Sequence, residues 1–542
     1  MPPPPDGSLA AEESSDEVAK SRGGRHKRQK GLSGNAAVTV VGALAGVLTG
    51  LLLDVAIAAT FGAGAATDAL FVAMRLPIGL AVIVMASANQ SLVPTFTSWR
   101  AAKNADDFSR SVCNLLTATL VLGACLALVG SLLAAPLMAV TAPGLSGADS
   151  SRAAQLAMIL FWILPCVAAA EVLRAYMNAQ RRFGVPAAMN VVMNGGAALI
   201  ILVWGSRGIA VAATAYLAGA LAQLLFMMLM ASRTGLRLRP VVAFRDPELL
   251  AAGRVSVRPL TAAGLNPLAR LAEQILVSFL PSGSITIVNY ANRLVSAIGG
   301  TVLFRSVMVV LLPRLTEAHH HGDRDEARSL VRSGILLMLR LAIPLTALMA
   351  VLSVPGALAV FHRGQFSRQD AVLLGITLAV YSSSLVGQAV QRALLAPFYA
   401  ALSMRVPLRN SVWGLVANIV LLLPVAFFLR GRETAALVGV GLAFSLSQYV
   451  NVAHAWWHLR RTLGKVAGPS MRRRVAVLLA ASLVEAAVLV AGTLLMGLQN
   501  DLGRLDLLVR TSVVAVCGLL AFAACVAVAQ RTRLVGRGQQ LA

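Results

Sequence analysis

The chain has 542 residues, of which 57% are hydrophobic and 13% are charged, and its formal net charge is +24. The charged share is about half the usual globular value. Together with a mean hydropathy of +0.75, this low charged share excludes a soluble enzyme. Positive charge in such a chain is typical of the cytoplasmic loops of membrane proteins, so we expect no nucleic-acid partner. Apolar runs of 18 or more residues recur from Asn35 onward, each long enough to cross ~30 Å of hydrocarbon, and we count about fourteen. The sequence predicts an all-α polytopic membrane protein that is not an enzyme.

The N-terminal segment 1–34 is rich in Pro, Ser and Glu and then becomes basic. Such a composition cannot bury enough apolar surface to fold, so we predict a disordered tail over 1–34. The basic residues directly precede the first apolar segment, which places this tail in the cytoplasm. That segment is too long for a signal peptide and lacks a convincing cleavage site.

Three charged residues lie within two apolar runs between Leu51 and Pro77, which flank the turn Phe61-Gly62-Ala63-Gly64. They are Asp54, Asp68 and Arg75. Charges inside apolar spans are costly in a bilayer and mark a pathway or binding site by default. This stretch is therefore the first candidate for a functional site.

Asp68 and Arg75 are seven residues apart, which puts them on one helix face about two turns from each other. They are too distant for direct contact but can line one wall of a cavity. The alternative for Asp68 is that it caps the start of the second span. Asp54 has no partner within one turn, so its partner must come from another helix, water or substrate.

An internal repeat is visible at one nearly constant offset in the numbering. Ala73-Met74-Arg75-Leu76 returns as Ala291-Asn292-Arg293-Leu294, an offset of 218, and Leu92-Val93-Pro94 returns as Leu311-Leu312-Pro313, an offset of 219. Arg174 likewise returns as Arg392. Parallel repeats are typical of transporters whose substrate site lies between the two halves. The sequence therefore predicts two parallel six-helix lobes followed by two further helices.

The second half adds its own intramembrane charges. Arg293 and Arg305 lie on the predicted eighth span without an acidic neighbour on that helix. An unpaired arginine suits an anionic ligand because guanidinium forms forked hydrogen bonds to phosphate. Snorkelling to the membrane surface is the alternative, and it suits Arg305 better. Two further pairs of opposite charge are each spaced i, i+3, namely Glu171/Arg174 and Arg270/Glu273. The two charges of each pair can neutralise each other, as a structural or a functional ion pair.

Loop charge predicts the topology. With the N-terminus inside, the cytoplasmic loops carry 26 Lys and Arg and the outer loops carry 7, not counting the N-terminal tail. This bias places both termini in the cytoplasm. The predicted organisation is tail 1–34, N-lobe 35–232, basic cytoplasmic linker 233–257, C-lobe 258–459, two further spans within 472–529, and cytoplasmic tail 530–542.

No cofactor or metal motif is found. The cysteines all fall in apolar spans and suit buried packing, and the exposed run His319-His320-His321 is only a weak compositional hint of metal binding. No phosphate-binding glycine loop, zinc spacing or nucleophile elbow is present in the sequence. We therefore expect no cofactor, and transport driven by a coupling ion or the membrane potential instead of ATP.

Several short motifs along the chain belong together: Phe61-Gly62-Ala63-Gly64, Ala66-Thr67-Asp68-Ala69, Phe71-Val72-Ala73, Arg75-Leu76-Pro77, Ser278-Phe279-Leu280, Ser282-Gly283-Ser284, Tyr290-Ala291-Asn292-Arg293-Leu294, Phe361 to Phe366 and Leu395-Ala396-Pro397. In these motifs the chain resembles the MurJ/MviN family of lipid II flippases, within the multidrug/oligosaccharidyl-lipid/polysaccharide exporter superfamily. The resemblance covers essentially the whole chain from about residue 36.

The resemblance implies a V-shaped pair of lobes around a cationic cavity, with a groove for a polyprenyl tail formed by the two helices within 472–529. It implies undecaprenyl-pyrophosphate carrying a disaccharide-pentapeptide as substrate, moved to the outer leaflet by alternating access. Asp54, Asp68 and Arg293 match family positions, and Arg293 falls on a cavity arginine.

The chain departs from the family where the family usually places charges. Val47, Leu53, Ala81 and Val82 stand at positions of family arginines, and Asn292 stands at the position of an acidic residue. Arg75, Arg270 and Arg305 are the arginines that can substitute for the missing charge. The candidate substrate-binding residues are therefore Asp54, Asp68, Arg75, Arg270, Arg293 and Arg305.

The favoured function is a flippase for lipid II or a related lipid-linked glycan in the plasma membrane of a bacterium. Its expected partners are that precursor and membrane lipids; we expect a monomer, with contacts to the cell-wall synthesis machinery left open. A drug or amphiphile antiporter of the same superfamily is the first alternative, although cation export favours carboxylates in the cavity. A non-transporting membrane scaffold derived from a flippase is the second.

Overall fold

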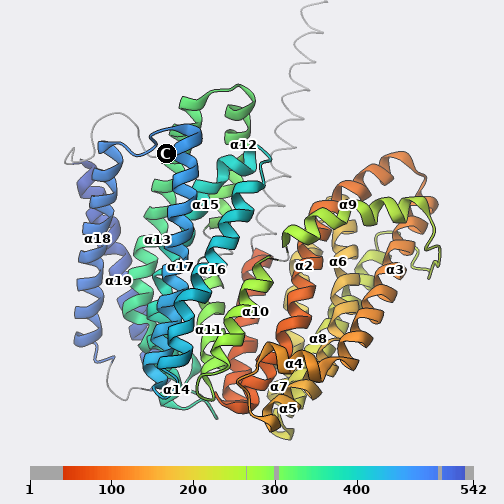
Figure 1. Ribbon diagram of the computed structural model, residues 1–542, viewed down its shortest axis with the longest axis horizontal. Helices are drawn as coiled ribbons and strands as arrows, with labels where there is room; N and C mark the ends of the chain where they lie inside the picture. Colours follow the sequence, from red (N-terminus) through yellow and green to blue (C-terminus); the bar gives the residue numbers. More distant parts are fainter. Residues whose placement is uncertain (1–40, 264, 298, 300–303, 499–502, 532–542) are drawn as a thin grey trace, which may run out of the picture.

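The described chain is helical throughout, as predicted (Figure 1). The computed structural model describes residues 41–531 apart from 264, 298, 300–303 and 499–502. The predicted tail 1–34 and most of the predicted tail 530–542 lie outside these residues. Within them the helices form two bundles that meet at one end and are displaced from each other at the other end.

The first bundle, the N-lobe, begins with the helix Val41–Phe61. That helix presents Gly42, Gly46 and Gly50 to α7, where a β-carbon at Gly42 would lie 2.3 Å from Cβ of Ala187. Small residues at this spacing let two membrane helices approach closely. The other N-lobe helices are α2 (Ala65–Ala102), α3 (Ala105–Leu132), α4 (Ala134–Thr141), α5 (Gly147–Leu160), α6 (Ile163–Ala179), α7 (Gly184–Trp204), the short 3₁₀ helix η1 (Gly205–Arg207) and α8 (Ala210–Ser232).

Helix α9 (Pro247–Ala263) begins in the predicted linker 233–257, continues into the predicted C-lobe and packs across α2. The second bundle, the C-lobe, follows. It consists of α10 (Leu265–Val277), α11 (Ser284–Val295), α12 (Phe304–His320), α13 (Arg324–Phe361), α14 (Arg368–Ser382), α15 (Ser384–Ala400), α16 (Arg405–Phe428) and α17 (Glu433–Leu463).

The lobes repeat each other in helix order. Helices α3 and α13 start at Ala105 and Arg324, and α7 and α16 start at Gly184 and Arg405, so both pairs keep nearly the offset of the sequence repeat. Both lobes also break their fourth span into two helices, α5 and α6 in one and α14 and α15 in the other. A shared break at equivalent positions is what a duplicated fold predicts, so the two-lobed parallel architecture is confirmed.

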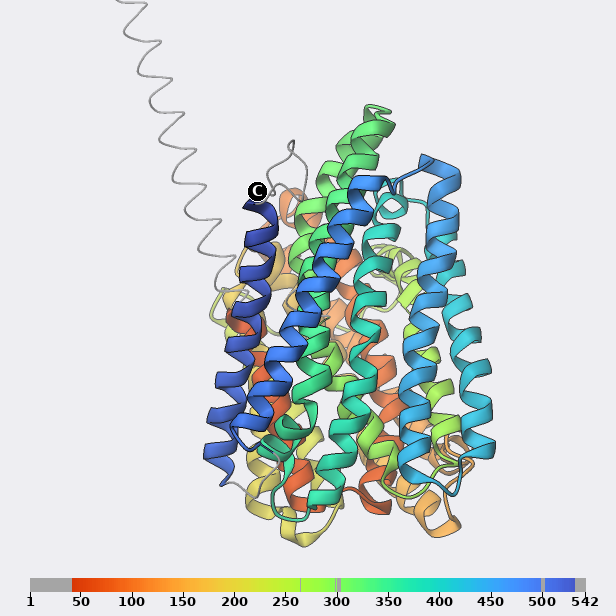
Figure 2. The same ribbon diagram turned by 90° about the vertical axis from the view of Figure 1, so that its left-hand side faces the viewer.

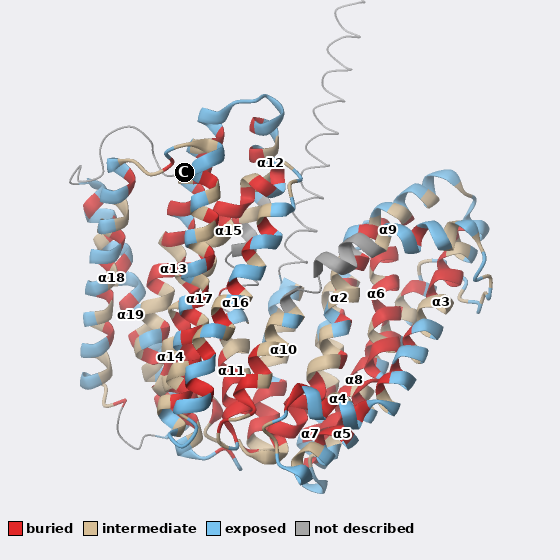
Figure 3. Ribbon diagram, viewed as in Figure 1, coloured by how far each residue is buried: buried red, intermediate tan, exposed pale blue. Residues whose placement is uncertain are grey.

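Twelve described helices are long and apolar enough to cross a membrane. The predicted seventh and eighth spans are not among them. Residues 264, 298 and 300–303 are not described, and the described parts of these spans are the helices α10, α11 and α12. The count of about fourteen therefore stays a prediction. Apolar side chains on the outer faces of the bundles are largely exposed (Figure 3), as expected for a lipid-facing surface.

Helices α18 (Pro469–Leu495) and α19 (Arg504–Arg531) form a pair against α13, on the side of the C-lobe away from the N-lobe (Figures 1 and 2). Their contact relies on small residues. A β-carbon at Gly492 would lie 2.8 Å from Val514, and one at Gly518 would lie 2.5 Å from Leu489. Both helices follow the last helix of the C-lobe in the chain and stand outside the repeat, as predicted.

The lobes touch through a narrow set of contacts that we call the inter-lobe seam. The Gln365 N–H donates to the Ala59 carbonyl at 2.8 Å, and the Gly144 N–H donates to Ser278 Oγ at 3.1 Å. A β-carbon at Gly364, which has φ +53°, would lie 2.1 Å from the Ala59 oxygen. Glycine is thus required where backbone meets backbone across the seam.

Candidate functional site

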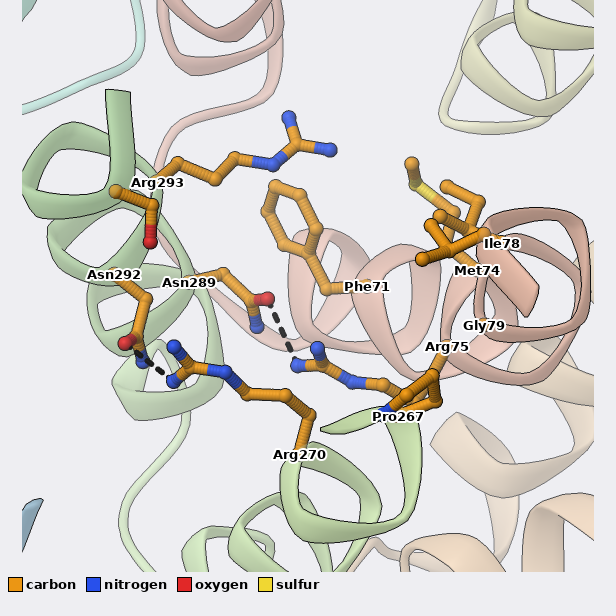
Figure 4. Close-up of a pocket in the computed structure, with 12 residues that line it drawn as sticks. Phe71, Met74, Arg75, Ile78, Gly79, Pro267, Arg270, Asn289, Asn292 and Arg293 are labelled. Atoms are coloured by element: carbon orange, nitrogen blue, oxygen red, sulfur yellow. Dashed lines mark hydrogen bonds between the residues drawn. The ribbon is translucent and has the colours of Figure 1, made fainter. Parts of the chain in front are cut away.

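A cavity of about 300 Å³ lies between the lobes. Its walls are the middle of α2 from the N-lobe and parts of α10 and α11 from the C-lobe. Three arginine side chains point into the same space, Arg75 from α2, Arg270 from α10 and Arg293 from α11 (Figure 4). The structure therefore brings together three of the six predicted site residues, which sequence reasoning could not place relative to one another.

Arg75 is held by neutral groups. Its Nε donates to Gln274 Oε1 at 2.7 Å, and a terminal nitrogen donates to Asn289 Oδ1 at 2.9 Å. Both partners belong to the C-lobe, so the guanidinium reaches across from α2 and is oriented by two amides. Amides fix its direction without cancelling its charge.

Arg293 pairs with Asp54 on the first helix. The expectation that Arg293 is unpaired was therefore wrong, because an acid 239 residues away in sequence supplies the partner. Of the three partners left open for Asp54, another helix, water or substrate, the structure shows a residue of another helix. The guanidinium also lies 5.8 Å from the centre of the Phe71 ring, and 36% of the Arg293 side chain stays exposed. This exposed part faces the cavity (Figure 4).

Arg270 belongs to a polar cluster between α10, α11 and α14. It donates to Glu273 at 3.0 Å and to Asn292, and Glu273 also accepts from the Tyr381 hydroxyl at 2.8 Å. The predicted i, i+3 pair is thus formed. Its guanidinium carbon lies 4.8 Å from the centre of the Phe444 ring. Glu273 is 4% exposed, so its negative charge is held behind Arg270 instead of in the cavity.

Counting charges shows what the cavity can bind. Three guanidinium groups are matched by two carboxylates, Asp54 and Glu273, and neither carboxylate is among the described residues that line the cavity. Positive charge therefore faces the space, with Arg75 as the group whose described hydrogen bonds go only to amides. Phosphate oxygens suit such a site because guanidinium binds them in a forked, charge-assisted geometry.

Asp68 has a different role from either one that we predicted. Its carboxylate accepts from the Gly283 N–H at 2.6 Å, from the Thr286 N–H at 2.8 Å and from Thr286 Oγ1 at 2.6 Å. It therefore caps the start of α11 in the other lobe, while Thr67 serves the start of its own helix. Asp68 is 2% exposed and is not among the residues that line the cavity. It belongs to the inter-lobe seam.

The remaining predictions have separate outcomes. The Glu171/Arg174 pair forms within the N-lobe, away from the cavity. The side chain of Arg305 lies outside the described residues. Sequence reasoning missed Gln274 and Asn289, because amides inside polar helix faces carry no distinguishing pattern until their helices are placed in space.

Comparison with known proteins gives the family. The family model described as lipid II flippase MurJ matches residues 57–511. The chain belongs to the MurJ lipid II flippase family. It is 28% identical over 509 residues to a probable lipid II flippase MurJ of Rhizobium meliloti, covering 90% of this chain and 91% of that protein. It is 27% identical over 471 residues to a probable lipid II flippase MurJ of Haemophilus influenzae, covering 81% and 88%.

Solved structures agree on the fold. A lipid II flippase MurJ in an inward closed conformation matches with a TM-score of 0.74, at 16% identity, over 92% of this chain and 99% of that one. An inward-facing multidrug resistance transporter of the MATE family matches with a TM-score of 0.62, at 13% identity, over 80% of this chain and 98% of that one. The chain is thus a multi-pass membrane protein with the MurJ fold.

Val82 lines the same cavity between the lobes. Two of the arginines predicted to supply charge in its place, Arg75 and Arg270, line it as well.

Proposed function

We propose that this protein moves a polyprenyl-pyrophosphate-linked cell-wall precursor, lipid II or a close relative, from the inner to the outer leaflet of the bacterial plasma membrane. The observation that carries the proposal is the set of three arginines around one inter-lobe cavity. A pyrophosphate is the part of such a lipid that needs concentrated positive charge, and forked guanidinium contacts suit it. Membership of the MurJ family supports the same substrate class.

The proposed orientation follows from loop charge. With both termini cytoplasmic, the turns at Gly62, Gly144, Gly283 and Gly364 are all outer loops, and these turns form the inter-lobe seam. The cavity in this conformation would then be closed toward the outside. Alternating access would consist of breaking the seam and joining the lobes at their cytoplasmic ends, driven by a coupling ion or the membrane potential.

The geometry argues against the first alternative. An exporter of cationic drugs needs negative charge in its cavity, whereas the described lining residues include no carboxylate. A scaffold without transport activity has no use for three buried or half-buried arginines, which are costly to keep in a membrane protein. We further propose that the protein acts as a monomer, because the cavity is completed by two lobes of one chain.

Depletion of the essential lipid II flippase of a host bacterium tests the proposal. Expression of this protein should sustain growth and peptidoglycan synthesis, and Arg75→Gln should abolish rescue. The matched control is Arg152→Gln, because Arg152 is an exposed arginine whose ion pair, among the described residues, is with Asp149 on its own helix. If the correctly inserted wild-type protein does not rescue growth, lipid II is not the cargo. Equal rescue by both variants would remove the proposed role of Arg75.

A further inference from the structure

A second cavity, of about 400 Å³, lies inside the C-lobe. It is lined by residues of α10, α12, α15, α16 and α17, and it is a different space from the inter-lobe cavity. Arg270 lines both cavities, so one guanidinium stands at their common boundary. We call this space the amide pocket, after the chemistry of its walls.

Neutral hydrogen-bonding side chains dominate the amide pocket. Two serine hydroxyls, Ser411 and Ser447, accompany five side-chain amides. The amides are Gln388, Gln391, Asn418, Gln448 and Asn451. Amides placed inside a membrane protein are costly unless they find partners. Two of the five do: Gln388 donates to Ser384 and Gln448 donates to Ser447.

Three of these amides lack partners. Asn451, 6% exposed, has a buried side-chain oxygen with no hydrogen bond. Across the described residues, Gln391 and the 7%-exposed Asn418 have no side-chain hydrogen bond either. Gly414 leaves room for the Asn451 side chain, because a β-carbon at position 414 would lie 2.4 Å from the side-chain nitrogen of Asn451. The unpaired buried oxygen of Asn451, together with the unpaired amides of Gln391 and Asn418 that line the same pocket, indicates a ligand that supplies the missing bonds.

Charge selects the class of ligand. Glu273 and Arg270 both line the amide pocket and neutralise each other, which leaves Arg392 as the other charged side chain among the described lining residues. By lining residues, the amide pocket has two arginines and one carboxylate, whereas the inter-lobe cavity, where a pyrophosphate fits, has three arginines and no carboxylate among the described residues. Side-chain amides both donate and accept, as sugar hydroxyl and acetamido groups do. The volume is within the range of roughly 300–1,000 Å³ that small-molecule sites occupy.

We propose that the amide pocket binds the sugar portion of the lipid-linked precursor while the arginines of the inter-lobe cavity bind its pyrophosphate. This inference rests on the proposed function and adds a second subsite to it. Arg270 lies where the pyrophosphate joins the first sugar, since it borders both spaces. Discrimination between the glycan-bearing lipid and the bare lipid carrier then comes from the C-lobe.

Equilibrium binding by the purified full-length protein in nanodiscs tests the proposal. The two probes are undecaprenyl pyrophosphate and the same lipid carrying an N-acetylated disaccharide. We expect the wild-type protein to bind the disaccharide lipid at least tenfold more tightly. Asn451→Leu and Asn418→Leu should bind both lipids equally, with the wild-type Kd for undecaprenyl pyrophosphate.

Controls separate this result from misfolding. Gln391→Leu is a second test with less risk to the fold, because Gln391 is half-buried and its substitution breaks no described side-chain bond. Asn410→Leu is the matched control, since Asn410 lies on α16 but does not line the pocket, and it should keep the tenfold preference. Equal binding of both lipids by the wild type refutes the sugar subsite and leaves the flippase proposal standing. Failure to bind either lipid refutes the proposed function, and the subsite with it.

Discussion

Replacing Asp68 with asparagine tests whether the inter-lobe seam holds the lobes together. The carboxylate accepts three hydrogen bonds at the start of α11. Other contacts between the lobes include the Gln365–Ala59 backbone bond, the Gly144–Ser278 bond and the side-chain contacts of Arg75 and Arg293 beside the cavity. Asp68→Asn keeps the size of the side chain but turns one oxygen into an N–H₂ group. If the remaining oxygen still accepts from Thr286, the new N–H₂ group faces the Gly283 N–H. Two hydrogen-bond donors then face each other, and neither has an acceptor in the other.

The expected cost follows from these contacts. Losing one hydrogen bond to a charged group costs about 1.5–3 kcal/mol, and removing a negative charge from a helix N-terminus costs about 0.3–2 kcal/mol. Together they weaken the closed seam by about 3 kcal/mol, which corresponds to a roughly 100-fold change in the ratio of separated to closed lobes. The penalty applies only to the closed form, because water reaches the asparagine once the lobes part.

Spin labels at Arg152 and Arg432 measure the outcome. Both residues are exposed; Arg152 lies on α5 of the N-lobe, and Arg432 stands at the start of α17 of the C-lobe. Electron–electron double resonance should show a longer inter-label distance appearing in Asp68→Asn, while Asp506→Asn, an exposed substitution on α19, leaves the distances unchanged. An unaltered distance distribution in a folded Asp68→Asn protein would refute the cap as a lock. The labels require replacement of the native cysteines Cys113, Cys125, Cys166, Cys517 and Cys525.

Three further substitutions make separate tests. Gly364→Ala places a β-carbon against the Ala59 oxygen in a left-handed conformation, so it should cost at least about 1 kcal/mol and lengthen the same inter-label distance. Glu273→Leu should lower thermal stability yet tighten undecaprenyl pyrophosphate binding about fivefold, or ~1 kcal/mol, because Arg270 loses its neutralising partner; weaker binding would contradict the charge count. Gly492→Leu should force α19 off α18 at a cost of about 1–3 kcal/mol, seen as a lower unfolding temperature without any change at the seam.

The two-lobed fold could be predicted because its signals are local. Apolar runs, loop charge and the internal repeat each depend on residues close in sequence or at one fixed offset. The candidate site depended on contacts between lobes, which no local pattern specifies. Arg293 looked unpaired because its partner Asp54 lies on another helix, and Asp68 looked like a cap for its own helix because the helix that it caps starts far along the chain, at Gly283.

The contact between Asp68 and Thr286 also bears on the origin of the fold. These residues are separated by 218 positions, the offset that relates the two lobes, so each is the counterpart of the other. A position that touches its own counterpart lies on the axis between repeats, where an ancestral pair of identical subunits would have met itself. Two aspartates facing each other there would repel. Fusion into one chain allows one copy to become the acceptor and the other the donor, so this seam could form only after the two halves had become free to differ.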